Sequence, residues 1–292
     1  MTSADGLVVV DKPAGWTSHD VVARLRRLAG TRRVGHAGTL DPMATGVLVV
    51  GIGRATRLLG YLAATDKGYD ATVRLGQSTS TDDAEGQPLA SVSAVHLQEA
   101  AVLAALEPLT GEVAQVPATV SAIKIGGRPA YARVRAGESV ELAPRTVTIS
   151  ELRLGGVRRA GPCLDLDVHV ECSSGTYVRA IARDLGAALG VGGHLTALRR
   201  TRVGGYRIQD ARPLTDLERE LTVLPLAGAV AAAFPRRDVD ADDARRIGHG
   251  VSLPAVGLGP GPVGVFGPDG SVLGLVQEGD GGARPLVVFV GS

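Results

Sequence analysis

One carboxylate near the start of the chain, Asp41, occupies a position suited to chemistry. It lies in the stretch Gly-His-Ala-Gly-Thr-Leu-Asp-Pro-Met-Ala-Thr-Gly, residues 35–46, and an apolar run follows directly. Pro42 fixes its own φ and disfavours the α region for Asp41, so the carboxylate is held on a stiff, extended loop. A carboxylate held in this way can act as a nucleophile. An isolated Asp-Pro pair is more often a turn in which the aspartate caps a nearby amide, so other residues must decide between the two interpretations.

The elements that must position this loop are predicted from the pattern of apolar residues. Short apolar runs or strict apolar–polar alternation, both typical of strands, occur at residues 7–10, 47–52, 69–75 and 164–170. Ser18 is a suitable N-cap for a helix that Gly30 ends, and another helix is predicted over residues 97–106. Strands and helices interleave without regular βαβ spacing. The pattern therefore predicts an α+β fold with a mixed, largely antiparallel sheet.

A second, smaller domain is predicted beyond residue 233. A short helical segment, residues 242–247, precedes glycine- and proline-rich sequence with brief apolar runs. Pro268-Asp269-Gly270 is a hairpin signature between two of these runs. A segment of about 60 residues is at the lower limit of what folds alone. We therefore divide the chain into residues 1–233 and 234–292.

The charge distribution favours a polyanionic partner, but only locally. The formal net charge of +1 argues against a globally basic nucleic-acid binder. Arginine and lysine nevertheless occur without any acidic residue in the windows 21–40, 113–137 and 185–209. These windows predict separate positive surfaces that contact a polyanionic partner.

Several other classes of protein are disfavoured. Cys163 and Cys172 lie in one strand-like segment, where alternation places them on opposite faces, so no disulfide framework is expected. The six histidines and two cysteines show no spacing typical of metal ligands. The glycine-rich loop lacks the Gly-Lys-Ser/Thr of a phosphate-binding P-loop, so a nucleotide triphosphatase is disfavoured. No apolar stretch reaches the roughly 20 residues of a membrane span, and the first residues do not resemble a signal peptide. We therefore expect a cytoplasmic protein without metal, cofactor or membrane contact.

The stretch around Asp41 resembles the active-site loop of the TruB family of tRNA pseudouridine synthases, Gly-His-x-Gly-x-Leu-Asp-Pro-x-Ala-Thr-Gly. Further segments are similar to other motifs of that family: Lys12-Pro13-x-Gly15-x-Thr17-Ser18, Asp66-Lys67-x-Tyr69, Ser121-Ala122-x-Lys124-x-x-Gly127-x-x-x-Tyr131, and Cys172-Ser173-x-Gly175-Thr176-Tyr177-Val178-Arg179. Residues 195–200 are similar to a stretch in which the family places a leucine, here Leu198, near the base. The resemblance covers residues 5–230.

The resemblance implies that the chain isomerises a uridine in the T loop of tRNA, at position 55, to pseudouridine. Asp41 is then the nucleophile, and Tyr69 stacks on the uracil and takes part in proton transfer. Arg179 keeps the carboxylate of Asp41 ionised, because a nearby positive charge favours the charged form. His36 contacts RNA when the target nucleotide is extruded, and Tyr177 orients the base.

The resemblance also implies how the RNA is held. The remaining substrate-binding candidates are Lys12, Lys67, Lys124, Arg128, Tyr131, Leu198 and Arg200. Residues from about 113 to 145 correspond to the thumb-like insertion with which the family grips tRNA. Residues 234–292 resemble a PUA domain, a small all-β barrel that accompanies RNA-modifying enzymes. We expect a monomer that binds the T arm of tRNA and needs no obligate protein partner.

Alternatives remain open on the residues alone. Tyr69 and Tyr177 could be core aromatics with satisfied hydroxyls, and Asp41 with Arg179 could form a structural ion pair. A glycosidase or RNA glycosylase also uses a carboxylate, but it normally needs a second acid, and none accompanies Asp41 within its motif. An RNA-binding protein or tRNA-folding chaperone without essential catalysis would use the basic windows equally well.

Overall fold

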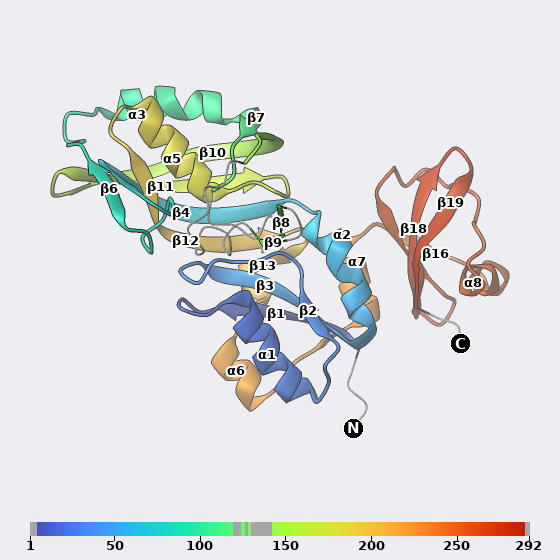
Figure 1. Ribbon diagram of the computed structural model, residues 1–292. Helices are drawn as coiled ribbons and strands as arrows, with labels where there is room; N and C mark the ends of the chain where they lie inside the picture. Colours follow the sequence, from blue (N-terminus) through green and yellow to red (C-terminus); the bar gives the residue numbers. More distant parts are fainter. Residues whose placement is uncertain (1–4, 119–123, 126–127, 130–141, 290–292) are drawn as a thin grey trace. The chain divides into compact units, whose positions relative to one another are not determined.

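The computed structural model describes residues 5–118, 124–125, 128–129 and 142–289 (Figure 1). It divides into two compact units. The first unit comprises Met1–Asp41, Gly46–Ala64 and Val203–Ser292, and the second comprises Pro42–Thr45 and Thr65–Arg202. The predicted site residue Tyr131 and most of the predicted thumb-like insertion lie outside the described residues.

The strands at the centre of the first unit are of mixed orientation. They are β1 (Gly6–Lys12), β2 (Val34–His36), β3 (Thr45–Ile52), β14 (Arg212–Pro213) and β15 (Leu224–Pro225). β1 runs antiparallel to β3 and β15 and parallel to β14, and β2 pairs antiparallel with β3. β1 and β3 contain the apolar runs predicted as strands, and both are almost wholly buried. A sheet of mixed orientation was predicted, and it is confirmed.

The helical segments of this unit include α1 (Ser18–Ala29), a 3₁₀ turn (Gly53–Leu58) that leads into α2 (Leu59–Ala63), a second 3₁₀ turn (Ile208–Asp210), α6 (Leu214–Arg219) and α7 (Leu226–Ala233). The expected end of α1 is confirmed, since Gly30 has a left-handed φ of 62°. Its expected N-cap is wrong by one residue. Thr17 caps the helix in a reciprocal capping box with Asp20, so Ser18 is already helical and its hydroxyl is used elsewhere.

The C-terminal part of the first unit is a four-stranded sheet in the order β16 (Arg236–Asp238), β17 (Pro262–Phe266), β18 (Val272–Gly279) and β19 (Gly282–Val288), accompanied by α8 (Ala241–Gly248). The predicted helix and hairpin are present. The expected all-β barrel is not formed by the described residues, because β16 and β19 remain the open edges of the sheet. Four short strands are too few to close, and part of the intervening sequence folds into α8.

Two apolar clusters stabilise this C-terminal sheet. Val263 and Val265 pack in one cluster with Ile247 of α8. Phe266 and Phe289 belong to the larger cluster that also contains residues of β1, β3 and α7. The guanidinium groups of Arg54 and Arg57 donate to the carbonyl oxygens of Phe289 and Val288, at 3.0 and 2.8 Å. These bonds fix the end of β19 to the segment that follows β3.

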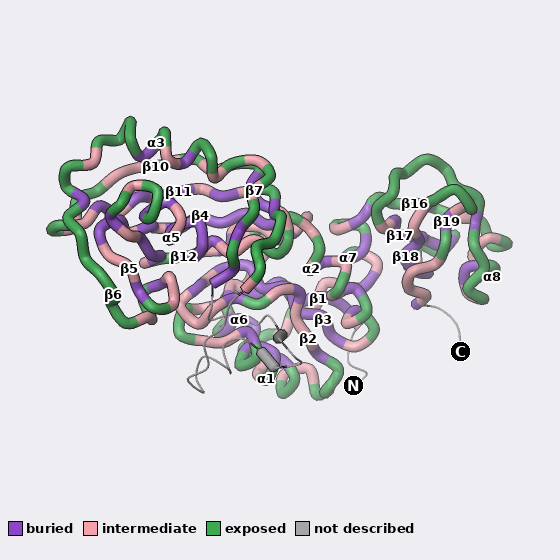
Figure 2. The backbone as a smooth tube through the Cα atoms, turned by 45° about the horizontal axis from the view of Figure 1, so that its top comes forward, coloured by how far each residue is buried: buried purple, intermediate pink, exposed green. Residues whose placement is uncertain are grey.

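The second unit is built on an antiparallel sheet. Its strands, in spatial order, are β12 (Gly193–Val203), β4 (Lys67–Leu75), β11 (Cys163–Cys172), β10 (Arg145–Ala160) and β7 (Gly111–Gln115). The predicted alternation is confirmed: Tyr69, Ala71, Val73 and Leu75 of β4 are buried, and the residues between them are more exposed. Figure 2 shows the resulting mixture of buried and exposed positions along these strands.

The remaining elements of the second unit are α3 (Glu99–Leu106), a 3₁₀ turn (Glu107–Leu109), α5 (Val178–Ala188) and the hairpins β5–β6 (Gln77–Thr79, Pro88–Ser91) and β8–β9 (Lys124–Ile125, Arg128–Pro129). Gly186 of α5 packs directly on the chain before β12. A Cβ added to it would overlap the backbone of Gly192 and Gly193. Within the part of the chain that is described, no helix has the length and apolar character to cross a membrane.

Candidate active site

Asp41 and the residues before it in its loop belong to the first unit, and Pro42–Thr45 belong to the second. Asp41 is half-buried. Gly38 and Gly46 have φ values of 94° and 97°, which favour glycine, so the loop could not follow this path with other residues there. The hydroxyl of Ser18 accepts from the Leu40 N–H at 2.9 Å and donates to the Leu40 carbonyl at 3.2 Å. The peptide before Asp41 is therefore tied to the first turn of α1.

Two other predicted residues lie in the first unit. His36 ends β2, and its ring meets the ring of His19 edge to face, with centroids 5.6 Å apart. Lys12 is fully buried, and its ammonium donates to the carbonyls of Pro13 and Trp16 at 2.9 and 2.6 Å. These bonds explain how a lysine is tolerated there, since a buried ammonium needs polar partners. Contact between Lys12 and RNA stays a prediction.

Arg179 lies in the first turn of α5, as expected, and is buried in the second unit. Its Nη1 donates to the Thr81 carbonyl at 2.9 Å and lies 3.4 Å from Oδ2 of Asp83. The carboxylate of Asp83 also accepts from the Glu85 N–H at 3.1 Å and from the Thr81 hydroxyl at 2.5 Å. The turn that follows β5 thus orients the Arg179 guanidinium through Thr81 and Asp83.

The same turn contains a second acid that faces α5. Asp82, with a left-handed φ of 60°, lies 3.2 Å from the guanidinium of Arg183. Burial raises the pKa of the Asp82 carboxyl, and the positive charges of Arg183 and Arg179 oppose that shift. Neither acid was singled out from the sequence. The available signal was the polar turn Thr-Asp-Asp-Ala-Glu-Gly directly after a strand, which does not reveal its distant partners.

The two predicted tyrosines are positioned by different means. Tyr69 is only 8% exposed and projects from β4 on the face opposite Asp70. Tyr177 is half-buried immediately before α5. The side chain of Gln115 clamps its backbone, accepting from the Tyr177 N–H at 2.8 Å and donating to the Tyr177 carbonyl at 3.1 Å. The backbone that carries each ring is therefore fixed, by β4 for Tyr69 and by Gln115 for Tyr177.

Two buried cations accompany Tyr69 in the second unit. Lys67 is 6% exposed and Arg200 is 1% exposed. Burial, followed by the charge of Arg200, lowers the pKa of the Lys67 ammonium to about 8. The ammonium donates to the Thr65 carbonyl. Leu198 is buried in β12, two residues from Arg200.

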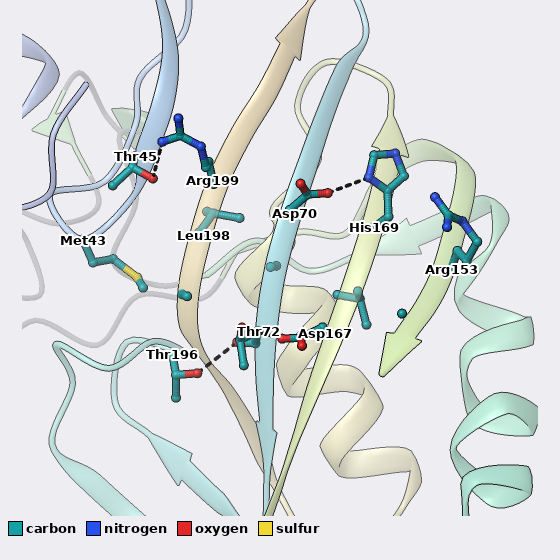
Figure 3. Close-up of a pocket in the computed structure, with 14 residues that line it drawn as sticks. Met43, Thr45, Asp70, Thr72, Arg153, Asp167, His169, Thr196, Leu198 and Arg199 are labelled. Carbon is teal, nitrogen blue, oxygen red and sulfur yellow. Dashed lines mark hydrogen bonds and ion pairs between the residues drawn. The ribbon is translucent and has the colours of Figure 1, made fainter. Parts of the chain in front are cut away.

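A hollow of about 580 Å³ opens beside strands β12, β4, β11 and β10, where Asp70 of β4 lies (Figure 3). Asp70 and His169 meet there, with 2.7 Å between Oδ1 and Nδ1, and the Thr72 hydroxyl donates to Asp167 at 2.9 Å. Leu198, the predicted base-contacting residue, also lines this hollow, whereas Tyr69 projects from β4 on the face opposite Asp70.

The predicted site residues are thus divided between the two units. Asp41, His36 and Lys12 belong to the first, whereas Tyr69, Tyr177, Arg179, Lys67, Leu198 and Arg200 belong to the second. The backbones of Lys124 and Arg128 form the short β8–β9 hairpin. Among the described residues, no group of three or more histidine, cysteine, aspartate or glutamate side chains is arranged to hold a metal ion.

Family models match nearly the whole sequence. The TruB family pseudouridylate synthase N-terminal domain matches residues 26–178, the tRNA pseudouridylate synthase B C-terminal domain matches residues 179–224, and the C-terminal region of tRNA pseudouridine synthase II matches residues 234–290. The chain belongs to the TruB family of pseudouridylate synthases.

Individual relatives agree with this assignment. The tRNA pseudouridine synthase B of Thermobifida fusca is 63% identical, with 99% of this chain and 100% of the relative covered. That of Streptomyces griseus is 60% identical, with 99% and 98% covered. Among solved structures, the Cbf5-Nop10-Gar1 complex contains a chain with a TM-score of 0.72 at 24% identity, covering 98% of this chain and 84% of that one. The structural likeness confirms the fold.

Proposed function

We propose that this protein converts the uridine at position 55 in the T loop of tRNA to pseudouridine, with Asp41 as the nucleophile. The observation that carries the proposal is the 63% identity, over the full length of both chains, to a protein named tRNA pseudouridine synthase B. Residues that determine a substrate are spread over a whole chain, so similarity of this extent supports the same substrate class as well as the same reaction.

The reaction rearranges bonds within one nucleotide. The N1–C1′ bond breaks, the uracil turns, and C5 bonds to C1′, while the hydrogen on C5 leaves as a proton and N1 gains one. A carboxylate nucleophile divides this exchange into easier steps. Attack at C1′, attack at C6 and a glycal route all start from an ionised Asp41. The stiff loop between Gly38 and Gly46 supports this role because it fixes the carboxylate in advance.

The residues of the second unit would act on the base and on the charge of Asp41. Arg179 keeps the Asp41 carboxylate ionised and aimed; its burial and its anchoring on Thr81 and Asp83 support a fixed guanidinium. Tyr69 stacks on the uracil and excludes water, since hydrolysis would leave an abasic site. Tyr177 and Leu198 orient the base, and His36 contacts the RNA once the nucleotide is extruded.

Binding of the T arm would come from other surfaces. We assign phosphate contacts to the acid-free windows, which include Lys124 and Arg128. The buried Lys12, Lys67 and Arg200, and Tyr131, remain predicted substrate-binding residues. Residues 1–233 then form the catalytic domain, with its gripping insertion at about 113–145, and residues 234–292 form a PUA-like RNA-binding domain. We further propose a cytoplasmic monomer that acts without cofactor.

Product analysis tests the reaction. The protein is incubated with a uridine-labelled tRNA transcript, and the RNA is digested to nucleosides and separated by chromatography. We expect a C–C-linked nucleoside with no release of base. Free uracil would identify a glycosylase, and unchanged uridine with tight tRNA binding would favour a chaperone.

A further inference from the structure

The first turn of α1 contacts the catalytic loop at two points. Ser18, 1% exposed, bonds to both backbone groups of Leu40, at 2.9 and 3.2 Å. Next to it, the ring of His19 meets the ring of His36 at a centroid distance of 5.6 Å and an interplanar angle of 84°. Consecutive residues of one helix thus touch the loop next to Asp41 and at its histidine, His36. We call Ser18 and His19 the α1 clamp.

Both sides of the His19–His36 contact are rigidly supported. The start of α1 is fixed by the capping box, in which the Asp20 N–H donates to the Thr17 hydroxyl at 3.1 Å and the Thr17 N–H donates to Asp20 at 2.9 Å. His36 lies in β2, which is paired with β3 through His36 and Val50. The backbones that carry the two rings are therefore fixed, one by the helix cap and the other by the strand pair.

We propose that His19 is a positioning residue that holds the imidazole of His36 in the orientation it uses on RNA, while Ser18 holds the peptide before Asp41. The inference rests on the proposed function, in which His36 contacts the extruded nucleotide. An edge-to-face contact restrains the tilt of a ring and occupies at most one of its two faces. His19 is exposed whereas His36 is half-buried, so His19 supports the ring from the solvent side.

The role is distinguishable from direct RNA binding by His19. A positioning residue acts only through His36, so its removal should matter little once His36 is absent. A residue that binds RNA itself should instead lower tRNA affinity, and its effect should add to that of removing His36.

The experiment compares His19→Ala, His19→Phe, His36→Ala and the double variant His19→Ala/His36→Ala. His96→Ala, at an exposed histidine before α3, is the matched control. Pseudouridine formation is measured in single-turnover reactions at saturating tRNA transcript, and tRNA affinity by filter binding. We expect His19→Ala to slow the reaction about threefold to tenfold, the range that the loss of one aromatic contact produces. Its tRNA affinity should stay within about twofold of the parent.

Phenylalanine keeps an aromatic ring at this position, so His19→Phe should react at close to the parental rate. The double variant should be no slower than His36→Ala, and the control should match the parent. An unchanged rate in His19→Ala, fully additive effects in the double variant, or a loss of affinity would each overturn the inference. A parent that forms no pseudouridine in tRNA would instead overturn the proposed function.

A second variant tests the other half of the clamp. Ser18→Ala removes both hydrogen bonds to Leu40 with little change of volume. We expect a slower single-turnover rate with retained tRNA affinity, and a lowered but still cooperative thermal transition because two buried hydrogen bonds are lost. If the rate were unchanged in the folded variant, Ser18 would have no part in positioning the loop.

Discussion

The guanidinium of Arg179 and the carboxylate of Asp83 form an ion pair whose side chains are only 5% and 4% exposed, with 3.4 Å between Nη1 and Oδ2. The pair joins α5 to the turn after β5, and residues far apart in the sequence provide its two charges. An ion pair of this kind fixes the orientation of the Arg179 guanidinium.

Removing the charge of Asp83 should therefore affect both stability and rate. Breaking a buried ion pair from one side costs about 3 kcal/mol or more, because the other charge stays buried. We expect Asp83→Asn to lower the free energy of unfolding by about that amount and to slow catalysis more than it weakens tRNA binding. Urea unfolding and single-turnover kinetics measure the two effects. Asp238→Asn, which breaks the exposed pair with Arg236, should leave both nearly unchanged.

Asp41→Asn tests the proposed nucleophile without removing the side chain. We expect turnover to be abolished, while tRNA affinity stays within about tenfold, or about 1.4 kcal/mol, because phosphate contacts supply most of the affinity. Filter binding and product analysis give the two values. Multiple-turnover activity in this variant would contradict the role of Asp41, and loss of binding in a folded protein would make the residue structural.

The proposed tRNA-binding residues Lys124 and Arg128 should behave differently from Arg179, for which a catalytic role is proposed. Lys124→Ala/Arg128→Ala should weaken tRNA binding. It should also make the slope of log affinity against log salt concentration shallower by about one to two, since each phosphate contact releases a counterion. Its rate at saturating tRNA should fall little. Arg179→Lys should show a large loss of rate with a modest change in affinity. If both variants changed tRNA affinity and reaction rate in the same proportion, the proposal that Lys124 and Arg128 bind tRNA while Arg179 acts in catalysis would be refuted.

The buried ammonium of Lys67 predicts a pH dependence of stability. Its pKa is about 8 in the folded protein, below the usual 10.5. Between these values the unfolded chain binds more protons at this site, so the contribution of Lys67 to stability rises with pH through that window. From pH 7 to 9 we expect the parent to gain about 1 kcal/mol of unfolding free energy relative to Lys67→Met.

Urea unfolding of both proteins at the two pH values checks this expectation. Cys172, whose pKa burial raises to about 11, is present in both proteins, so its own opposite contribution cancels in the comparison. A difference between parent and variant that stays constant from pH 7 to 9 would show that Lys67 does not titrate there.

Two glycine-to-alanine substitutions should have opposite effects on stability. Gly186→Ala places a Cβ against the backbone of Gly192 and Gly193, so α5 must shift and the thermal transition should fall. Gly60→Ala, in α2, meets no atom within 4 Å and should stabilise the protein by about 0.5–1 kcal/mol, because alanine is the better helix former. Equal transition temperatures for the two variants would contradict the packing described for α5.

Periodicity explains which parts of the fold were predictable. The alternation of β4 and β11 is set by burial of one face, and it can be read directly from the residues. The N-cap of α1 was misplaced because Thr17 and Ser18 are both good caps, and only the reciprocal bond with Asp20 selects Thr17. The barrel was expected from a family resemblance, whereas the strands that would close it do not occur in the described residues.

The candidate site was predictable where its residues lie in recognisable motifs. Asp83 was missed because its partner Arg179 is brought to it only by the fold, and a polar turn has an ordinary explanation by itself. The burial of Lys12 was also not foreseen. A lysine after a strand is normally solvated, and here the carbonyls of its own loop provide the partners.

Mapping the modified nucleotide tests the central claim most directly. A full-length tRNA transcript and a transcript with cytidine in place of the uridine at position 55 are each incubated with the parent protein and with Asp41→Asn, and pseudouridine is located by chemical labelling and primer extension. The account predicts a single pseudouridine at position 55, formed only by the parent and only in the uridine-containing transcript. Modification at another position with none in the T loop, or modification by Asp41→Asn, would contradict it.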